Sequence, residues 1–153
     1  MARVRIVERA DGGVSVINVA PGFGDPGEPE DTRLDRAFTL TVAKNPQFQG
    51  RPFHDQDSTT FPIRRFRNAW KKGATSVDVD MPTARTIRAD ELAAEVEQRR
   101  SRAVKERAKA KGSKRQGWKT HLDALDATEF DLDAITTPEA LAAFVPAWPA
   151  DPA

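Results

Sequence analysis

The 153-residue sequence contains no cysteine and no tyrosine, and its only histidines are His54 and His121. Without cysteine, the chain forms no disulfide and offers no thiolate for catalysis or for a zinc or iron–sulfur site. Two histidines cannot build a three-histidine metal site, and they leave only two candidate bases for a serine-type triad. The composition therefore excludes several kinds of chemistry before any motif is considered.

Long apolar runs are also missing. No stretch approaches the ~20 residues that a helix needs to cross a bilayer, and the N-terminal segment MARVRIVERADGG lacks the apolar core of a signal peptide. With 39% hydrophobic and 31% charged residues, the composition is typical of a soluble protein with one modest domain and some extensions. We therefore expect a chain that folds in a cytoplasm, with no membrane span and no cofactor.

The formal net charge of +1 conceals a strong segregation of charge along the chain. Residues 1–63 hold seven basic and nine acidic side chains, and residues 64–119 hold seventeen basic and seven acidic ones. Residues 120–153 hold seven acidic side chains and no basic one. Such a distribution creates strong local fields, which favour contacts with charged partners or between the chain's own segments.

Alternating apolar residues predict several strands. Residues 3–18 alternate on both sides of an Asp-Gly turn, which predicts a β-hairpin that ends at Pro21. Residues 38–42 (FTLTV) and 76–81 (SVDVDM) alternate in the same way and predict two further strands of one small sheet.

The rest of residues 20–62 is rich in proline and glycine and predicts a long loop arm. The arm contains Phe23, Phe48, Phe53 and Phe61, which together predict that it docks through its aromatic side chains. The chain's own core and a partner protein are both open as the docking surface, and we favour the own core.

A helix is predicted from Pro82 onward, with Asp80 as its N-cap. It packs on the sheet through Ile87 and Leu92, with Trp70 as a core anchor. Two short helices follow, one with a Trp118, Leu122 and Leu125 face and one beginning at TTPEAL and stopped by Pro146.

The expected fold is therefore α+β, a small antiparallel sheet packed by a helix, with a helical C-terminal part. Residues 1–98 form the domain with its arm, 99–117 a basic helical extension or linker, and 118–153 short helices with an acidic surface. Whether 99–117 is helical or disordered stays open.

Two polar motifs are candidates for metal or acid–base chemistry. The FHDQD stretch at 53–57 places His54 beside Asp55 and Asp57, but we favour a plain polar loop over a metal site. The carboxylates of Asp78 and Asp80 share one strand face, where an edge strand and a helix cap explain them. No nucleophile with a base and an orienting group emerges, so the sequence predicts no enzyme.

The basic run at 99–119 holds ten Lys or Arg residues against Glu106 alone. Phosphate contact would use these charges, with Trp118 stacking on a base. We favour the alternative, in which the run is solvated or is paired by the acidic segment that follows, which folds back on it or pairs with a neighbouring copy. The contact residues proposed for partners are Phe23, Phe48, Phe53, Arg99, Arg100, Lys105, Lys109, Lys111, Lys114, Arg115 and Trp118.

Four segments carry a family resemblance: the opening MARVRIVERADGGVSVINVAPG, FRNAW at 66–70, VDVDMPTARTIRADEL at 77–92 and the closing ITTPEALAAFVPAWP. In this order they resemble an uncharacterised family of small proteins of tailed bacteriophages and prophages, whose genes accompany tail and tail-fibre modules. The match covers about half of the chain, and the family offers no catalytic residues to carry over.

The resemblance implies a non-enzymatic, tail-associated virion protein, made in the bacterial host cytoplasm and held by protein–protein contacts. Its partners would be other phage structural proteins in symmetric multiple copies. Two alternatives stay open: a tail-fibre assembly helper absent from the mature virion, and a nucleic-acid-binding module that uses residues 99–119.

Overall fold

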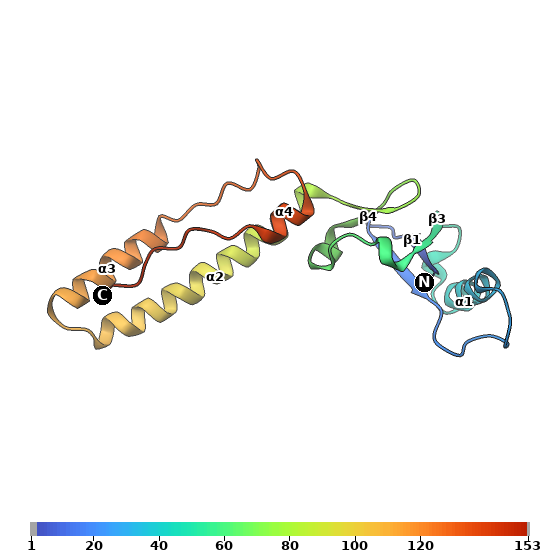
Figure 1. Cartoon of the computed structure of the whole chain (residues 1–153), viewed down its shortest axis with the longest axis horizontal. Helices are drawn as coiled ribbons and strands as arrows, with labels where there is room; N and C mark the ends of the chain where they lie inside the picture. Colours follow the sequence, from blue (N-terminus) through green and yellow to red (C-terminus); the bar gives the residue numbers. More distant parts are fainter. Residues whose placement is uncertain (1–2, 153) are drawn as a thin grey trace. The chain divides into compact units, whose positions relative to one another are not determined.

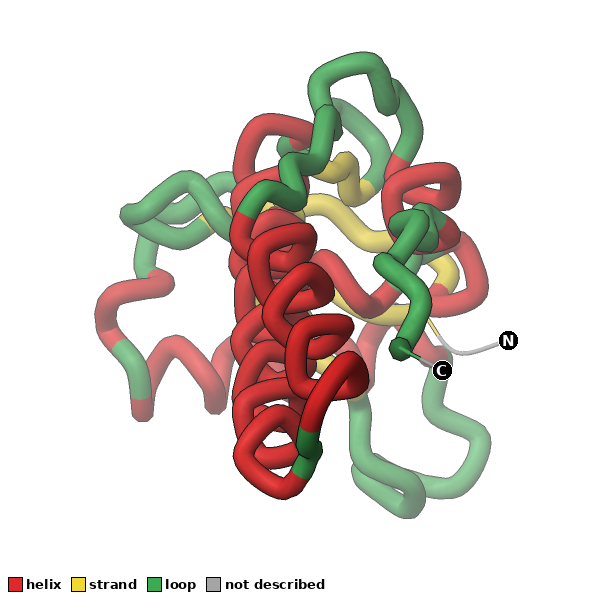
Figure 2. Tube along the Cα trace, turned by 90° about the vertical axis from the view of Figure 1, so that its left-hand side faces the viewer, coloured by secondary structure: helices red, strands yellow, loops and turns green. Residues whose placement is uncertain are grey.

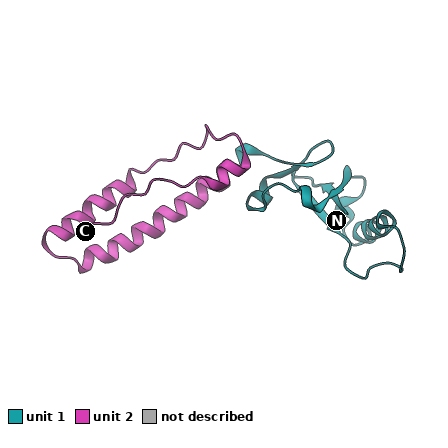
Figure 3. Cartoon of the chain, in the orientation of Figure 1, with its two compact units in different colours: residues 1–84 teal, residues 85–153 magenta. Residues whose placement is uncertain are grey.

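The computed structural model describes residues 3–152 and divides the chain into two compact units between Ala84 and Arg85 (Figure 3). The first unit holds the described strands and helix α1, and the second unit is helical with connecting loops. The expected α+β class, with small antiparallel sheets, is confirmed. The division differs from the predicted boundaries at 98 and 117, because it falls in the first turn of the long helix.

The predicted N-terminal hairpin is confirmed. Strands β1 (Arg3–Glu8) and β2 (Val14–Asn18) pair antiparallel, with Ile6 opposite Val16 (Figure 1). The turn between them is sharp because Gly12 takes a φ of 80°, in the left-handed region that glycine adopts without steric cost.

A third strand, β3 (Phe53–Asp57), pairs with the other side of β1, which gives the order β2-β1-β3. The prediction of a loop at these residues is wrong. The polar sequence FHDQD conceals the strand because its side chains are paired by groups from other parts of the chain, as Asp55 is by Arg5 directly opposite.

Helix α1 (Glu30–Lys44) replaces the strand predicted at 38–42, which is therefore wrong. Its Leu34 is fully buried, and the helix packs on β1 and β2. The threonines that suggested alternation bond within the helix: Thr39 and Thr41 donate to the carbonyl oxygens four residues earlier, at 2.9 and 2.8 Å. Residues 20–62 are thus not one loop arm, since they contain α1 and β3.

Three 3₁₀ segments complete the first unit before its second sheet: η1 (Pro46–Phe48), η2 (Ser58–Thr60) and η3 (Arg64–Ala69). The second sheet pairs β4 (Trp70–Lys72) with β5 (Val77–Val79), which confirms the strand predicted near 76–81. It is a separate sheet rather than a continuation of the first.

The core of the first unit joins the two sheets. Trp70 is 3% exposed and packs with Val4, Ile6, Val14 and Val77, and its role as core anchor is confirmed. Since neighbouring residues of a strand face opposite sides, β1 places Val4 and Ile6 on this core while Arg5 faces α1.

The second unit is a helical hairpin with a returning tail. Helix α2 (Met81–Lys109) runs beside α3 (Gly112–Asp126), and α4 (Pro138–Ala143) follows (Figures 1 and 2). Ala103 of α2 packs with Trp118, Leu122 and Leu125 of α3, so the predicted α3 face is confirmed. The basic run is helical up to Lys109 and again from Gly112.

Ile87 and Leu92 lie in the second unit, not in the unit that holds the sheet on which they were predicted to pack. Leu92 is fully buried, as is Leu141 of α4, whereas Ile87 is only half-buried. Among the described residues, none of the helices combines the length and the apolar content that a membrane crossing requires.

Candidate functional site

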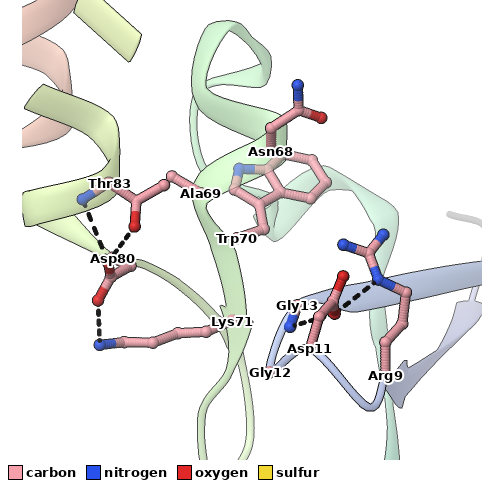
Figure 4. A pocket seen from close by; sticks show the side chains of 10 residues that line it. All are labelled: Arg9, Asp11, Gly12, Gly13, Asn68, Ala69, Trp70, Lys71, Asp80 and Thr83. Atoms are coloured by element: carbon pink, nitrogen blue, oxygen red, sulfur yellow. Dashed lines mark hydrogen bonds and ion pairs between the residues drawn. The ribbon is translucent and has the colours of Figure 1, made fainter. Parts of the chain in front are cut away.

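A cavity of about 370 Å³ opens in the first unit beside Trp70 (Figure 4). It is formed where the turn of the N-terminal hairpin meets η3, β4 and the start of α2. Its walls are Arg9, Asp11, Gly12, Gly13, Asn68, Ala69, Trp70, Lys71, Asp80 and Thr83.

The charges of this cavity are paired with one another. Asp80 accepts hydrogen bonds from Lys71 Nζ (3.1 Å) and from the backbone N–H of Thr83 (3.2 Å). Asp11 accepts from Arg9 Nε (3.1 Å) and from the backbone N–H of Gly13 (3.0 Å). These contacts cap α2 and close the hairpin turn, so the carboxylates already have structural roles (Figure 4).

The same contacts keep both carboxylates ionised. Hydrogen bonds from the Thr83 side chain and from Lys71 hold the pKa of Asp80 below its ordinary value. The Arg9 side chain and the Gly13 N–H do the same for the pKa of Asp11. A lowered pKa makes a carboxyl a poor proton donor near neutral pH, which argues against acid catalysis here. The indole Nε1 of Trp70 is buried and has no hydrogen-bond partner among residues 3–152.

A second polar cluster surrounds Arg5, whose side chain is only 6% exposed. Its guanidinium binds both oxygens of Asp55 at 2.8 Å and one oxygen of Asp35 at 2.7 Å. It also lies over the rings of Phe53 and Phe38, at 4.3 and 5.0 Å from their centroids. A bidentate pair between aromatic rings is a strong structural contact, and it holds β3 and α1 on β1.

Gln56 connects the two sheets of the first unit. Its buried Oε1 accepts a hydrogen bond from the backbone N–H of Val77 (3.0 Å) and lies 3.0 Å from His54 Nε2. Its Nε2 donates to Thr60 Oγ1 at 3.2 Å. His54 therefore faces an amide, and among the described residues no group of three or more His, Cys, Asp or Glu side chains is placed to hold a metal.

In the second unit, the start of the basic run is paired by the chain's own C-terminal part. Arg100 binds Asp126 (2.9 Å) and Arg102 binds Asp151 (2.7 Å). The guanidinium of Arg99 lies 4.2 Å from the centre of the Trp148 ring. The predicted fold-back of the acidic segment is thus confirmed for this part of the run.

The end of the hairpin remains cationic. We call its exposed residues the cationic tip: Lys105, Lys109, Lys111, Lys114 and Arg115. Within residues 3–152, Lys109 pairs with Glu106 (2.9 Å), whereas the other four have no ion pair. The tip therefore presents a concentrated positive charge, of which Glu106 offsets only a part.

The aromatic residues predicted to contact partners differ in exposure, since Trp118 is buried whereas Phe53 is 47% exposed. Trp118 is 6% exposed and belongs to the hairpin core, so its ring is not available to stack on a base. Phe23 lies under the guanidinium of Arg36, Phe53 contacts Arg5 and Phe38, and Phe48 is half-buried in η1. Phe23 and Phe53 therefore contact their own unit, as the favoured prediction for the arm had it.

Arg88 is not among the residues that the sequence motifs predict to be important. This side chain is 4% exposed and donates to Glu91 (3.1 Å), Glu95 (3.4 Å) and the carbonyl oxygen of Phe144 (2.9 Å). It ties the segment after α4 to α2. The sequence feature that could have revealed its burial is the spacing of Ala84, Arg88 and Leu92. These residues lie four apart, which places the arginine on the buried stripe of the helix.

Comparison with known proteins gave no match: no family model, no curated protein and no solved structure resembles this chain significantly.

Proposed function

We propose that this chain is a non-catalytic structural protein of a tailed bacteriophage or prophage, associated with the tail of the virion and acting through protein–protein contacts. The observation that carries the proposal is the form of the second unit. The C-terminal segment neutralises the start of the basic run, while the cationic tip stays exposed and unpaired apart from Lys109. A surface with one sign of charge orients and accelerates association with an acidic partner surface.

In the proposed structural role, the residues of the motifs that carry the sequence resemblance maintain the architecture. Trp70 anchors the first core, Asp80 caps α2, and Thr137 caps α4 by accepting a hydrogen bond from the backbone N–H of Ala140 (3.3 Å). Copies in a particle follow its rotational symmetry, so each tip would meet the same partner surface.

Mass spectrometry of purified particles, from the phage or induced prophage that encodes the chain, tests this location. We expect the chain in the particles at a fixed ratio to the tail subunits. Its presence in infected-cell lysates together with its absence from particles would contradict the virion role and favour the assembly helper.

Charge reversal tests the role of the tip. We expect the double variant Lys111→Glu and Lys114→Glu to reduce incorporation into particles strongly, because both side chains are exposed and unpaired within the described chain. The matched control reverses Lys44 and Arg51 in the first unit and should leave incorporation unchanged. Equal incorporation of both variants would show that the tip does not make the contact.

A nucleic-acid-binding role is the second candidate, favoured by the same unpaired cations. Filter binding of DNA across salt concentrations tests it, since each phosphate contact contributes a slope of about −0.9 in a plot of log affinity against log salt. If DNA retention weakens with salt and is lost in the Lys111→Glu and Lys114→Glu variant, the nucleic-acid-binding role replaces the first proposal. Absent or salt-insensitive retention would leave the protein contact in place.

A further inference from the structure

A second cavity of the first unit, of about 430 Å³, also reaches Trp70 but differs in its chemistry. It is formed by the end of β2, by η2 and η3, and by the residues that join these two segments. Its walls are Val16, Asn18, Ser58, Phe61, Pro62, Arg64, Arg67 and Trp70. The volume lies within the range of about 300–1,000 Å³ that is typical of ligand pockets.

Half of this wall is apolar. Val16, Phe61 and Trp70 belong to or pack on the core of the first unit, and Pro62 continues the surface. The rings of Phe61 and Trp70 are stacked, with centroids 5.1 Å apart and planes inclined by 26°. This part of the cavity is therefore fixed by core packing and suits an apolar group.

The other half consists of polar side chains that can donate hydrogen bonds. Arg64 and Arg67 are exposed, and neither forms an ion pair within residues 3–152. The wall also carries the hydroxyl of Ser58 and the amide of Asn18, and it contains no acidic side chain. The cavity beside Asp80 is different, because there each cation already has a carboxylate.

We propose that this cavity binds a carboxylate carried next to an apolar side chain on a peptide segment of a partner protein. The planar guanidinium groups of Arg64 and Arg67 match a carboxylate, which accepts paired hydrogen bonds from such groups. The apolar wall buries the neighbouring side chain. The inference goes beyond the cationic tip and holds whether or not the chain belongs to a phage particle.

The aromatic geometry favours a peptide over a nucleotide. A base would need an open ring face, but Trp70 is 3% exposed and Phe61 already stacks on it. An aliphatic side chain needs only an apolar surface of the kind that Val16 and Pro62 extend.

Nuclear magnetic resonance titration of the full ¹⁵N-labelled chain tests the proposal. The probes are N-acetyl-leucine, which carries a terminal carboxylate, and N-acetyl-aspartyl-leucine amide, which carries a side-chain carboxylate. N-acetyl-leucine amide is the uncharged control. The reporters are the backbone N–H groups of Ser58, Arg64 and Arg67 and the indole N–H of Trp70.

We expect saturable shifts at these reporters with at least one carboxylate probe, and binding of the uncharged control weaker by at least about tenfold. The tighter of the two carboxylate probes identifies the source of the group, a chain terminus or an acidic side chain.

The double variant R64Q and R67Q should lower the affinity of the chain for the carboxylate probe by about tenfold or more. The single variants R64Q and R67Q are titrated with the same carboxylate probe, and each changes only one side chain of the cavity. R51Q is the matched control, because Arg51 belongs to the same unit but donates to the carbonyl oxygen of Gln47 (3.4 Å) and does not line the cavity.

Three results would overturn the proposal: equal binding of the uncharged control, unchanged binding in the arginine variants, or tighter saturation of the same reporters by adenosine monophosphate. None of them bears on the particle experiment. A negative titration and a negative particle analysis therefore reject different claims.

Discussion

At the scale of single residues, the first unit depends on polar side chains in buried positions. Arg5 and Gln56 are both less than a tenth exposed, and each has several hydrogen-bond partners from other elements. The hydrogen bonds to Asp55 hold the pKa of Arg5 above its ordinary value, even though burial alone would lower it. A buried charge of this kind requires its partner, because an unpaired guanidinium in the same place loses its hydration without compensation.

We expect Asp55→Ala to destabilise the chain by about 3–5 kcal/mol, because it leaves the buried Arg5 without its main partner. Asp35→Ala is the matched control: its carboxylate contacts the same guanidinium but its side chain is 69% exposed, so we expect a loss of less than about 1 kcal/mol. Urea unfolding of both variants measures the difference. Similar losses would show that the buried pair does not dominate the energetics.

At the scale of secondary-structure elements, the local sequence predicts the starts of α2 and α4 well. It predicts the elements in the middle of the first unit poorly. The Asp80 cap and the Thr137 cap are each confirmed by a hydrogen bond to the first turn. Residues 30–44 carry both patterns, since FTLTV alternates while Leu34, Phe38 and Val42 recur every four residues. The helix forms because its Leu34 stripe packs on β1 and β2, which the local sequence does not reveal.

The cap makes stability depend on pH in a definite direction. Since folding lowers the pKa of Asp80, its contribution is present above the unfolded value of 3.8 and is lost as the pH falls through the folded value. We expect Asp80→Ala to cost about 1 kcal/mol at pH 7 and clearly less at pH 3. Urea unfolding at both pH values measures this.

Asp78→Ala is the control for the cap, because Asp78 lies two residues away and its carboxylate accepts a 3.2 Å hydrogen bond from the Ser76 hydroxyl rather than from the first turn of α2. A constant Asp80→Ala effect between pH 7 and pH 3 would contradict the role of an ionised cap.

At the scale of the whole molecule, each unit of the described chain has a hydrophobic core cluster of its own. One contains Trp70 with residues of β1, β2 and β5, and the other contains Trp118 and Leu122 with Ala103. Each core lies within one unit. Because a cooperative unit is held together by its own buried contacts, we expect the two units to respond separately to core mutations.

Trp70→Ala should lower the stability of the first unit by about 3–5 kcal/mol, and Leu122→Ala that of the second by about 2–5 kcal/mol. Hydrogen exchange read by mass spectrometry locates each loss. We expect faster exchange in β1 and β4 for the first variant and in α2 and α3 for the second. Loss of protection throughout the chain in both variants would show a single cooperative unit.

The sequence by itself determined the features that depend on neighbouring residues. The Asp-Gly turn, the alternation before it and after it, the Asp80 and Thr137 caps and the Trp118 face each act within a few residues, so they are present before the chain folds. The excess of positive charge at 99–119 is equally a property of the sequence.

Only the tertiary structure decided which polar side chains are buried and which charges stay free. β3 is a strand because Arg5 and Val77 satisfy its polar groups, and Arg88 is buried because acidic and carbonyl oxygens surround it. The same holds for the surfaces proposed to bind partners: Arg100 and Arg102 are neutralised by residues at least 26 positions away, whereas Lys111 and Arg64 are not. Such pairing depends on distances in space, and the residue order alone does not contain them.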